Sequence, residues 1–237
     1  MSDSANVDAF IRSLDQPMTV DRRLYVLDQL VAYWHGTCRN EDGYSDEELQ
    51  GSALPDPLRW WYLRGGRRAN VLSHQNQLVD PHDLTVDSDG RMIFYVENQG
   101  VYIWATDPEG EDPAVLGRFD AEGEPWIKEE VSLSGFLIQV CLFEAILGAP
   151  CGAWASWADQ ALLDRVTAPL RLVPLGPWRW PSYPGRFWTS NGVFVFACPN
   201  GPSPEVPAFS IWVGAKSTNP LGYLKSIVDD SWDYTAL

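Results

Sequence analysis

The residues best suited to catalysis are three histidines that lie in or beside polar loops: His35, His74 and His82. Next to His74, the chain offers Ser73 as a nucleophile, and Asp83 as an orienting carboxylate. A catalytic triad is defined by its geometry, so closeness along a polar loop does not establish one. The chain contains no G-x-S-x-G elbow, phosphate-binding glycine loop or H-E-x-x-H metal motif. We therefore expect a protein that is not an enzyme.

The cysteines contain no C-x-x-C pair, and three of the four lie among apolar or small neighbours: Cys38, Cys141, Cys151 and Cys198. This spacing predicts neither a zinc site nor a disulfide framework. The first residues are polar and acidic, unlike a secretion signal. The longest apolar stretch, residues 136–151, is interrupted by Gln139 and Glu144 and predicts a buried helix, not a membrane span. We therefore expect a cytoplasmic protein with reduced thiols.

The chain carries 32 acidic and 17 basic residues, for a formal net charge of −15. Such a field repels phosphate backbones and anionic membrane surfaces, so we expect neither nucleic acid nor a membrane as a partner. A basic protein would be attracted, because complementary fields speed encounter. Residues 107–124 and 229–233 are the acidic stretches best placed for such steering.

Twelve tryptophans are many for this length, and such rings either fill a core or anchor an interface. Trp178, Trp180, Tyr183 and Trp188, with Arg179 and Arg186 nearby, offer an aromatic platform for a small ligand or a glycan. The alternative is that these rings only pack a long proline-rich loop. Adjacent Trp60 and Trp61 point about 100° apart on a helix, so one of them can reach a surface.

Residues 91–105 show two runs of alternating apolar side chains around the polar hinge at residues 97–100, a pattern typical of a β-hairpin. Gly100 suits a tight turn because it adopts positive φ freely. Acids, amides and aromatic rings in this hairpin could form a recognition surface: Glu97, Asn98, Gln99, Tyr102 and Trp104. The alternative is an ordinary turn with a solvated acid and two core rings.

The remaining patterns predict helices and strands in mixed order. Apolar spacing and capping residues predict helices over residues 20–34 (capped by Thr19 or Asp21), 45–51 (from the Ser45 and Glu48 capping box), 58–64, from Ser132 or Ser134 to 147, 154–166 and 220–228. Strands are predicted over residues 186–189, 193–198, around Asn191-Gly192, and 209–215, with a short one near residues 115–119. Residues 174–184 are a candidate boundary or long loop. This order favours an α+β fold with an antiparallel sheet.

One part of the chain resembles a known superfamily. The resembling residues are Leu54-Pro55, the run from Leu58 to Tyr62, Gly65, residues 78–84, the hairpin from Asp89-Gly90 to Trp104, and Ser134 to Leu137. Together they resemble the SUKH superfamily, which includes the yeast cell-wall-assembly regulator and many bacterial immunity proteins. The resemblance covers roughly residues 45–147. It implies an α+β domain with helices around a central antiparallel sheet, no cofactor, and a role in binding other proteins.

We therefore expect a SUKH-like domain over residues 1–148 and a strand-rich C-terminal extension over residues 149–237, which either packs on the same sheet or folds separately. The expected function is that of an immunity protein, which neutralises a toxin by direct binding; the toxin domain is expected to be basic. The alternatives are a small-ligand or glycan-binding protein and a regulatory scaffold. The oligomeric state stays open. The predicted partner-binding residues are Glu97, Asn98, Gln99, Tyr102, Trp104, Trp60, Trp61, Asp107, Glu109, Glu111 and Asp112.

Overall fold

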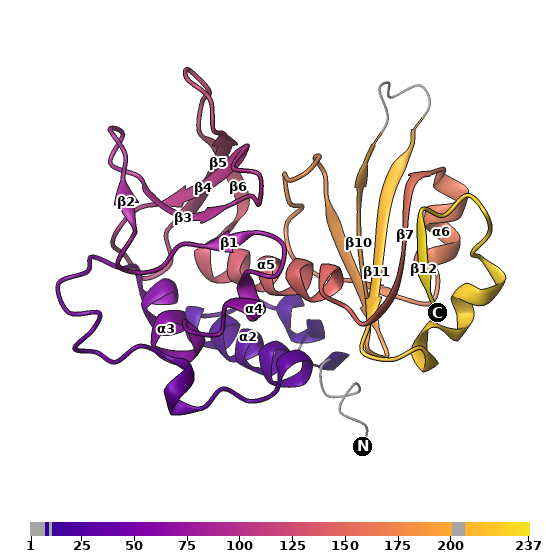
Figure 1. The fold of residues 1–237 in the computed structure, drawn as a ribbon, viewed down its shortest axis with the longest axis horizontal. Helices are drawn as coiled ribbons and strands as arrows, with labels where there is room; N and C mark the ends of the chain where they lie inside the picture. Colours follow the sequence, from indigo (N-terminus) through magenta and orange to yellow (C-terminus); the bar gives the residue numbers. More distant parts are fainter. Residues whose placement is uncertain (1–7, 10, 201–206) are drawn as a thin grey trace. The chain divides into compact units, whose positions relative to one another are not determined.

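The computed structural model describes residues 8, 9, 11–200 and 207–237, and the chain divides into two compact units (Figure 1). The N-terminal unit is Met18–Glu144. The C-terminal unit is Ala145–Leu237 together with the described residues before Met18. The division lies a few residues before the position expected from the sequence, and both units combine helices with antiparallel strands. The class is α+β, as predicted.

The N-terminal unit contains one antiparallel sheet, called sheet A, and the helices that pack on it. Its elements are α2 (Val20–His35), η2 (Asn40–Asp42), α3 (Asp56–Gly65), α4 (Ala69–Leu72), β1 (Gln77–Leu78), β2 (Thr85–Val86), β3 (Met92–Val96), β4 (Tyr102–Thr106), β5 (Ala114–Phe119), β6 (Ile127–Ser132) and most of α5 (Leu133–Leu147). The strand order in sheet A is β1-β3-β4-β5-β6, and β2 pairs with β3 beside β1. The predicted β3–β4 hairpin is confirmed, and Gly100 takes a φ of 72° in its turn.

Aromatic rings join sheet A to α5. The Phe136 ring of α5 lies 5.7 Å from the Phe94 ring and 5.8 Å from the Trp104 ring, between centroids. Figure 1 shows α2 and α3 on the same side of the sheet as α5. Such ring contacts add to the free energy that burial alone supplies. The sheet and α5 therefore form the core of the N-terminal unit, and the predicted buried helix is confirmed.

The polar residues that interrupt α5 are both fully buried. The Glu144 carboxylate accepts hydrogen bonds from the Tyr95 hydroxyl at 2.6 Å and from the Gln75 N–H at 2.5 Å. Burial raises the pKa of this carboxyl above its ordinary value. Glu144 thus anchors the segment before β1 to the helix, which is why an acid is tolerated inside an apolar stretch.

Two helix starts differ from the sequence prediction. The capping box forms as expected, because Ser45 N–H donates to Glu48 and Glu48 N–H donates to the Ser45 hydroxyl, but the residues after it make only a turn. Gly51, at a φ of 85°, follows that turn. At α5, the carboxylate that caps the first turn comes from Asp112, which accepts the Ser134 N–H at 2.8 Å. The helix over residues 20–34 and its Thr19 cap are confirmed.

The C-terminal unit contains a second antiparallel sheet, called sheet B. Its elements are η1 (Ser13–Asp15), the end of α5, β7 (Cys151–Ala158), α6 (Gln160–Thr167), β8 (Arg171–Leu172), β9 (Arg186–Ser190), β10 (Val193–Pro199), β11 (Phe209–Ala215), η3 (Asn219–Ser226) and β12 (Tyr234–Ala236). The strand order is β12-β7-β11-β10-β9-β8. Among the described residues, strand pairing keeps sheets A and B separate, so the C-terminal residues do not extend the first sheet.

One face of sheet B forms the core of the C-terminal unit. Figure 1 shows α6 lying against one side of the sheet. Strand residues such as Ile211 and Val213 pack there with Leu163 and Val166 of α6 and with Leu221 of η3. Burial of these apolar side chains supplies most of the favourable free energy of the unit.

The predicted helix over residues 154–166 is partly wrong, because residues 151–158 form strand β7 and only Gln160–Thr167 forms a helix. The large side chains of β7, Trp154 and Trp157, are three residues apart, which is closer to a helical spacing than to the period of a strand. Gly152 allows β7 to approach β11 closely, since an added Cβ would lie 2.2 Å from the Val213 carbonyl oxygen. Residues 151–158 therefore form a strand because they pair with β11 on one side and with β12 on the other.

The other predictions for the last third are confirmed. Strands β9 and β10 flank Asn191-Gly192, where Asn191 has a φ of 52° and Gly192 a φ of 81°. Strand β11 has the predicted bounds, and η3 occupies the position of the last predicted helix. Residues 174–184 form a loop inside the C-terminal unit, so they are not a boundary. No described helix has the length and apolar run needed to cross a bilayer.

Candidate functional site

The predicted hairpin residues divide between the turn and the core. The Glu97 carboxylate is mostly buried and accepts the Gln99 N–H at 2.8 Å, so it stabilises the turn. Tyr102 and Trp104 are buried, and the Trp104 indole N–H donates to Glu129 at 3.1 Å. Asn98 and Gln99 are exposed. Of the five predicted hairpin residues, these two present their side chains to solvent.

The two adjacent tryptophans of α3, Trp60 and Trp61, differ in burial. Trp61 is buried, whereas Trp60 is half-buried. A helix that packs on one side explains this difference, because neighbouring positions point about 100° apart. Trp60 is therefore the ring of this pair that a partner could reach.

The predicted acids after β4 have different environments. Asp112 accepts hydrogen bonds from Arg23, Ser132 and Ser134, so its carboxylate is used inside the fold. Asp107 is exposed and pairs with Arg91. Glu109 and Glu111 are exposed, with no ion pair within the described residues. The acids of this loop therefore differ in role: Asp112 stabilises the fold, whereas Asp107, Glu109 and Glu111 are exposed.

Antiparallel pairing brings the β3–β4 turn beside a second acidic loop, the connection between β5 and β6. The Asp120 N–H donates to the Val101 carbonyl oxygen at 3.0 Å, and Tyr102 is the register partner of Phe119. Phe119 is 51% exposed and Ile127 is 45% exposed at the two ends of this loop. We call the following set the acidic corner: Gln99, Val101, Phe119, Asp120, Glu122, Glu124 and Ile127. It combines exposed apolar side chains with exposed carboxylates.

The charge of the chain is concentrated in the unit that carries this corner. The N-terminal unit has 23 acids and 10 bases, a net charge of −13, whereas the C-terminal unit has 9 acids and 7 bases, a net charge of −2. In the described part of the N-terminal unit, at least eight bases form ion pairs: Arg23, Arg39, Arg59, Arg64, Arg67, Arg68, Arg91 and Arg118. Among the residues that the structure describes, no base forms an ion pair with the three acids of the acidic corner, Asp120, Glu122 and Glu124.

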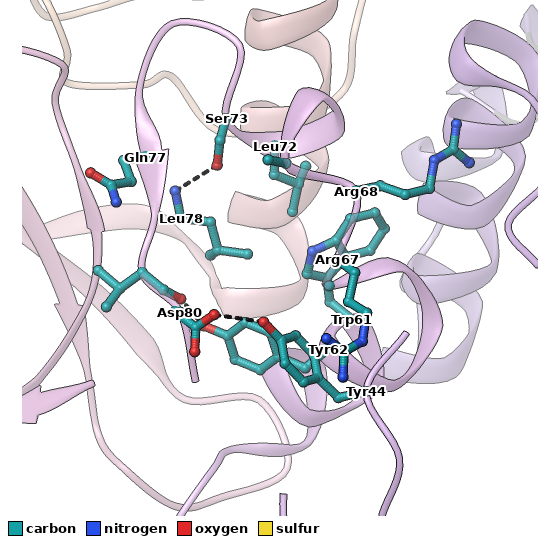
Figure 2. A pocket seen from close by; sticks show the side chains of 13 residues that line it. Tyr44, Trp61, Tyr62, Arg67, Arg68, Leu72, Ser73, Gln77, Leu78 and Asp80 are labelled. Atoms are coloured by element: carbon teal, nitrogen blue, oxygen red, sulfur yellow. Dashed lines mark hydrogen bonds between the residues drawn. The ribbon is translucent and has the colours of Figure 1, made fainter. Parts of the chain in front are cut away.

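The N-terminal unit also holds a pocket of about 370 Å³ beside α3, α4 and β1, shown in Figure 2. Its apolar floor includes Trp61, Tyr62 and Leu72, all buried. Polar lining residues include Tyr44, Arg67, Arg68, Ser73, Gln77 and Asp80. The Tyr62 hydroxyl donates to the Val79 carbonyl oxygen at 2.7 Å, which fixes the ring against the start of sheet A.

The charged groups that line this pocket are held by partners within the N-terminal unit. The Tyr44 hydroxyl donates to Asp80 at 2.6 Å, and burial together with this bond raises the pKa of Tyr44 to about 12. Burial alone would raise the pKa of Asp80, but hydrogen bonds from Tyr44 and from the His82 N–H outweigh it and leave that pKa below its ordinary value. The Arg67 guanidinium lies 4.2 Å from the centre of the Tyr44 ring and pairs with Glu48. The pocket therefore suits a small uncharged molecule better than an ion.

The pocket does not assemble a nucleophile with a base. The Ser73 hydroxyl accepts the Leu78 N–H at 2.8 Å, and Figure 2 shows this bond at the edge of the pocket. Within the described residues, no hydrogen bond joins the side chains of Ser73, His74 and Asp83. Within the same residues, no group of metal-ligating side chains is gathered for an ion.

The aromatic platform expected near residues 178–188 is divided by sheet B. Trp178 is fully buried and contacts Phe187 and Phe196. Trp188 packs against the core on the opposite face of the sheet. Tyr183 is exposed, with the Arg179 guanidinium 4.7 Å from its ring centre. These rings therefore do not form one surface. Sequence reasoning missed the exposed rings of β7 and β12, because β7 reads as part of a helix and β12 is short.

We found no family model, curated protein or solved structure that matches the chain. The resemblance to the SUKH superfamily therefore stays a prediction.

Proposed function

We propose that this protein acts by binding a basic protein through the acidic corner, in the cytoplasm and without catalysing a reaction. The observation that carries the proposal is the position of Phe119 and Ile127, both about half exposed, at the ends of a loop with three carboxylates that have no ion pair within the described residues. Exposed apolar groups ringed by polar ones are typical of protein interaction sites.

The charge of the N-terminal unit supports a basic partner. A net charge of −13 on 127 residues gives a field that attracts positive surfaces over about a Debye length, near 8 Å at physiological salt. Steering of this kind raises the association rate more than it slows dissociation. The apolar side chains of the corner would then supply the short-range part of the affinity.

The resemblance to the SUKH superfamily extends the proposal to the kind of partner. Immunity proteins neutralise toxins by covering their active or substrate sites. If the toxin were a nuclease, its phosphate-binding surface would be basic, and the carboxylates of the acidic corner could occupy it. The four cysteines are free, as expected for a protein that works in a reducing compartment.

The test compares two charge-matched variants in affinity capture from lysate of the source cells. The first, Asp120→Asn/Glu122→Gln/Glu124→Gln, neutralises the acidic corner. The second, Asp83→Asn/Glu109→Gln/Glu111→Gln, removes the same charge from exposed positions outside it. We expect wild type and the second variant to retain one stoichiometric basic protein at low salt, and the first variant to lose it.

A photo-crosslinking residue at position 99 locates the contact, with position 47 as the control. We expect crosslinks to the captured protein from position 99 only. Equal capture by both variants, or capture that does not change between 50 and 500 mM salt, would contradict the proposal. Toxicity of the captured protein in a susceptible cell, relieved by wild type and not by the first variant, would support the immunity role.

A further inference from the structure

The C-terminal unit exposes large aromatic rings on sheet B. Trp154 is 39% exposed, Trp157 is 69% exposed and Tyr234 is 55% exposed. All three lie in β7 and β12, at one edge of the sheet. Single exposed apolar residues are common, but several neighbouring aromatic rings mark a binding surface. Neither the acidic corner nor the pocket of the N-terminal unit includes them.

The rings belong to a row that crosses five strands. Tyr234 of β12 pairs in register with Trp154 of β7, and Trp154 pairs with Trp212 of β11. The row continues through Phe196 and Phe187, which are buried. Trp178 contacts both of these phenylalanine rings and covers that half of the row. The half formed by Tyr234, Trp154 and Trp212 stays open.

Two rings of the open half are parallel to each other. The Trp154 and Trp212 rings are parallel to within 8°, with centroids 6.3 Å apart. Strands lie about 4.8 Å apart, so the three open positions span about 10 Å across the sheet. The faces of the Trp154 and Trp212 rings therefore have a common direction.

A bulge in β7 adds Trp157 to the same face. The register between β7 and β11 shifts between Ile211 and Phe209, so that two β7 residues, Ser156 and Trp157, lie opposite one. Ala155 and Ala158 both point into the core, although an unbroken strand would place residues three apart on opposite faces. Bulges commonly re-aim a side chain beside a functional site. Here the bulge leaves Trp157 outside the core.

Hydrogen-bonding groups lie beside these rings. Asp233, next to Tyr234, accepts both the N–H and the hydroxyl of Ser156, at 2.6 and 2.7 Å. A carboxylate can accept about four hydrogen bonds, so Asp233 keeps acceptor capacity for a ligand hydroxyl. The Asn200 amide donates to the Ser156 carbonyl oxygen at 2.5 Å and holds the bulge in place. The rim is thus polar and rigid.

We propose that this surface, formed by Trp154, Trp157, Trp212 and Tyr234, binds a chain of uncharged sugar rings. Aromatic faces carry negative partial charge and attract the C–H groups on the flat side of a sugar ring, while Asp233 accepts hydroxyl protons. A net charge of only −2 on this unit gives no steering toward an ionic partner. The register of Tyr234, Trp154 and Trp212 on neighbouring strands gives a row of rings that fits a repeating chain of flat units. This inference does not depend on the function proposed for the acidic corner.

The test is isothermal titration calorimetry of the full chain with the hexasaccharides of β-1,4-linked glucose, xylose and N-acetylglucosamine and of α-1,4-linked glucose. We expect saturable binding of at least one of them. Trp157→Ala should weaken that binding about tenfold, whereas Trp157→Phe should keep most of it, because the stacking face remains. Tyr25→Ala, which removes an exposed ring of α2, is the matched control and should bind like wild type.

Thermal unfolding of each variant establishes that it is folded before its affinity is compared. Absence of binding to all four hexasaccharides would overturn the proposal, as would binding that is unchanged in both Trp154→Ala and Trp157→Ala. Analytical ultracentrifugation of wild type and Trp157→Ala measures whether the exposed rings hold two copies of the chain together. A dimer that dissociates in Trp157→Ala, together with no sugar binding, would assign the rings to an interface between copies and would also overturn it.

Discussion

The two units differ in net charge, and one tryptophan from each, Trp104 and Trp157, differs in exposure. In the N-terminal unit Trp104 is fully buried between sheet and helix, and the surface carries most of the charge of the chain. In the C-terminal unit Trp157 is exposed, and the surface is almost neutral overall. Both units are built on antiparallel sheets, so the fold class does not decide this difference. The groups that each sheet leaves at its surface indicate the chemistry of its partner.

The largest expected effect separates the buried from the exposed tryptophan. Trp104→Ala should lower the free energy of unfolding by about 3–5 kcal/mol, because it opens a cavity and leaves Glu129 without the indole N–H. Trp157→Ala should change it by no more than about 0.5 kcal/mol. Urea denaturation followed by circular dichroism measures both. Similar losses in the two variants would mean that the β7 ring is part of a core.

A smaller effect should separate two neighbouring acids in one loop. Asp112→Ala removes the acceptor for Arg23, Ser132 and Ser134, so we expect a loss of about 3 kcal/mol in the free energy of unfolding. Glu111→Ala is the matched control and should cost about 0.5 kcal/mol or less, since that side chain is exposed. If the two variants were equally stable, the cap that Asp112 provides for α5 would be irrelevant to folding.

The smallest effect concerns acid stability at Glu48, the ion-pair partner of the pocket residue Arg67. Hydrogen bonds from the Ser45 N–H, and then from Arg67, lower the pKa of Glu48 from its ordinary 4.5 to about 2. A carboxyl with a lowered pKa stabilises the folded state above pH 4.5, and this contribution is lost as the pH falls from about 4.5 to about 2. Glu48→Gln should therefore lose less stability than wild type across that interval. Parallel acid-unfolding curves for wild type and Glu48→Gln would contradict the assignment, and titration of the Glu48 carboxyl by NMR measures its pKa directly.

Local patterns in the sequence predicted much of the fold. The spacing of Leu24, Leu27 and Val31 identified α2, and Asn191-Gly192 identified the turn between β9 and β10. These signals depend on residues close in the chain, where side-chain period and backbone preference are sufficient. Edge strands gave weaker signals. Strand β6 carries Lys128, Glu129 and Glu130 in succession, and β12 has only three residues.

The candidate surfaces could not be predicted from the sequence, because their residues come together only through strand pairing. The hairpin turn and the acidic residues 120–124 were both noted in the sequence, but the hydrogen bond between Asp120 and Val101 is what places them together. The open aromatic row joins Tyr234, Trp154 and Trp212 from three strands far apart in the chain. Because register across a sheet is set by the whole fold, spacing along the chain could not reveal that row.

The bond between the Asp8 carboxylate and the Asn191 N–H joins residues 183 positions apart, and this bears on the order in which the protein is made. The N-terminal unit has all of its residues once Glu144 has been synthesised. Ile11 and Leu14 are buried in the C-terminal unit, so they have no complete binding surface until β9 and β10 have emerged from the ribosome. Domains commonly fold during translation as their residues become available. We therefore expect residues 18–144 to fold first. Ile11 and Leu14 are expected to become buried only after the last third of the chain has been synthesised.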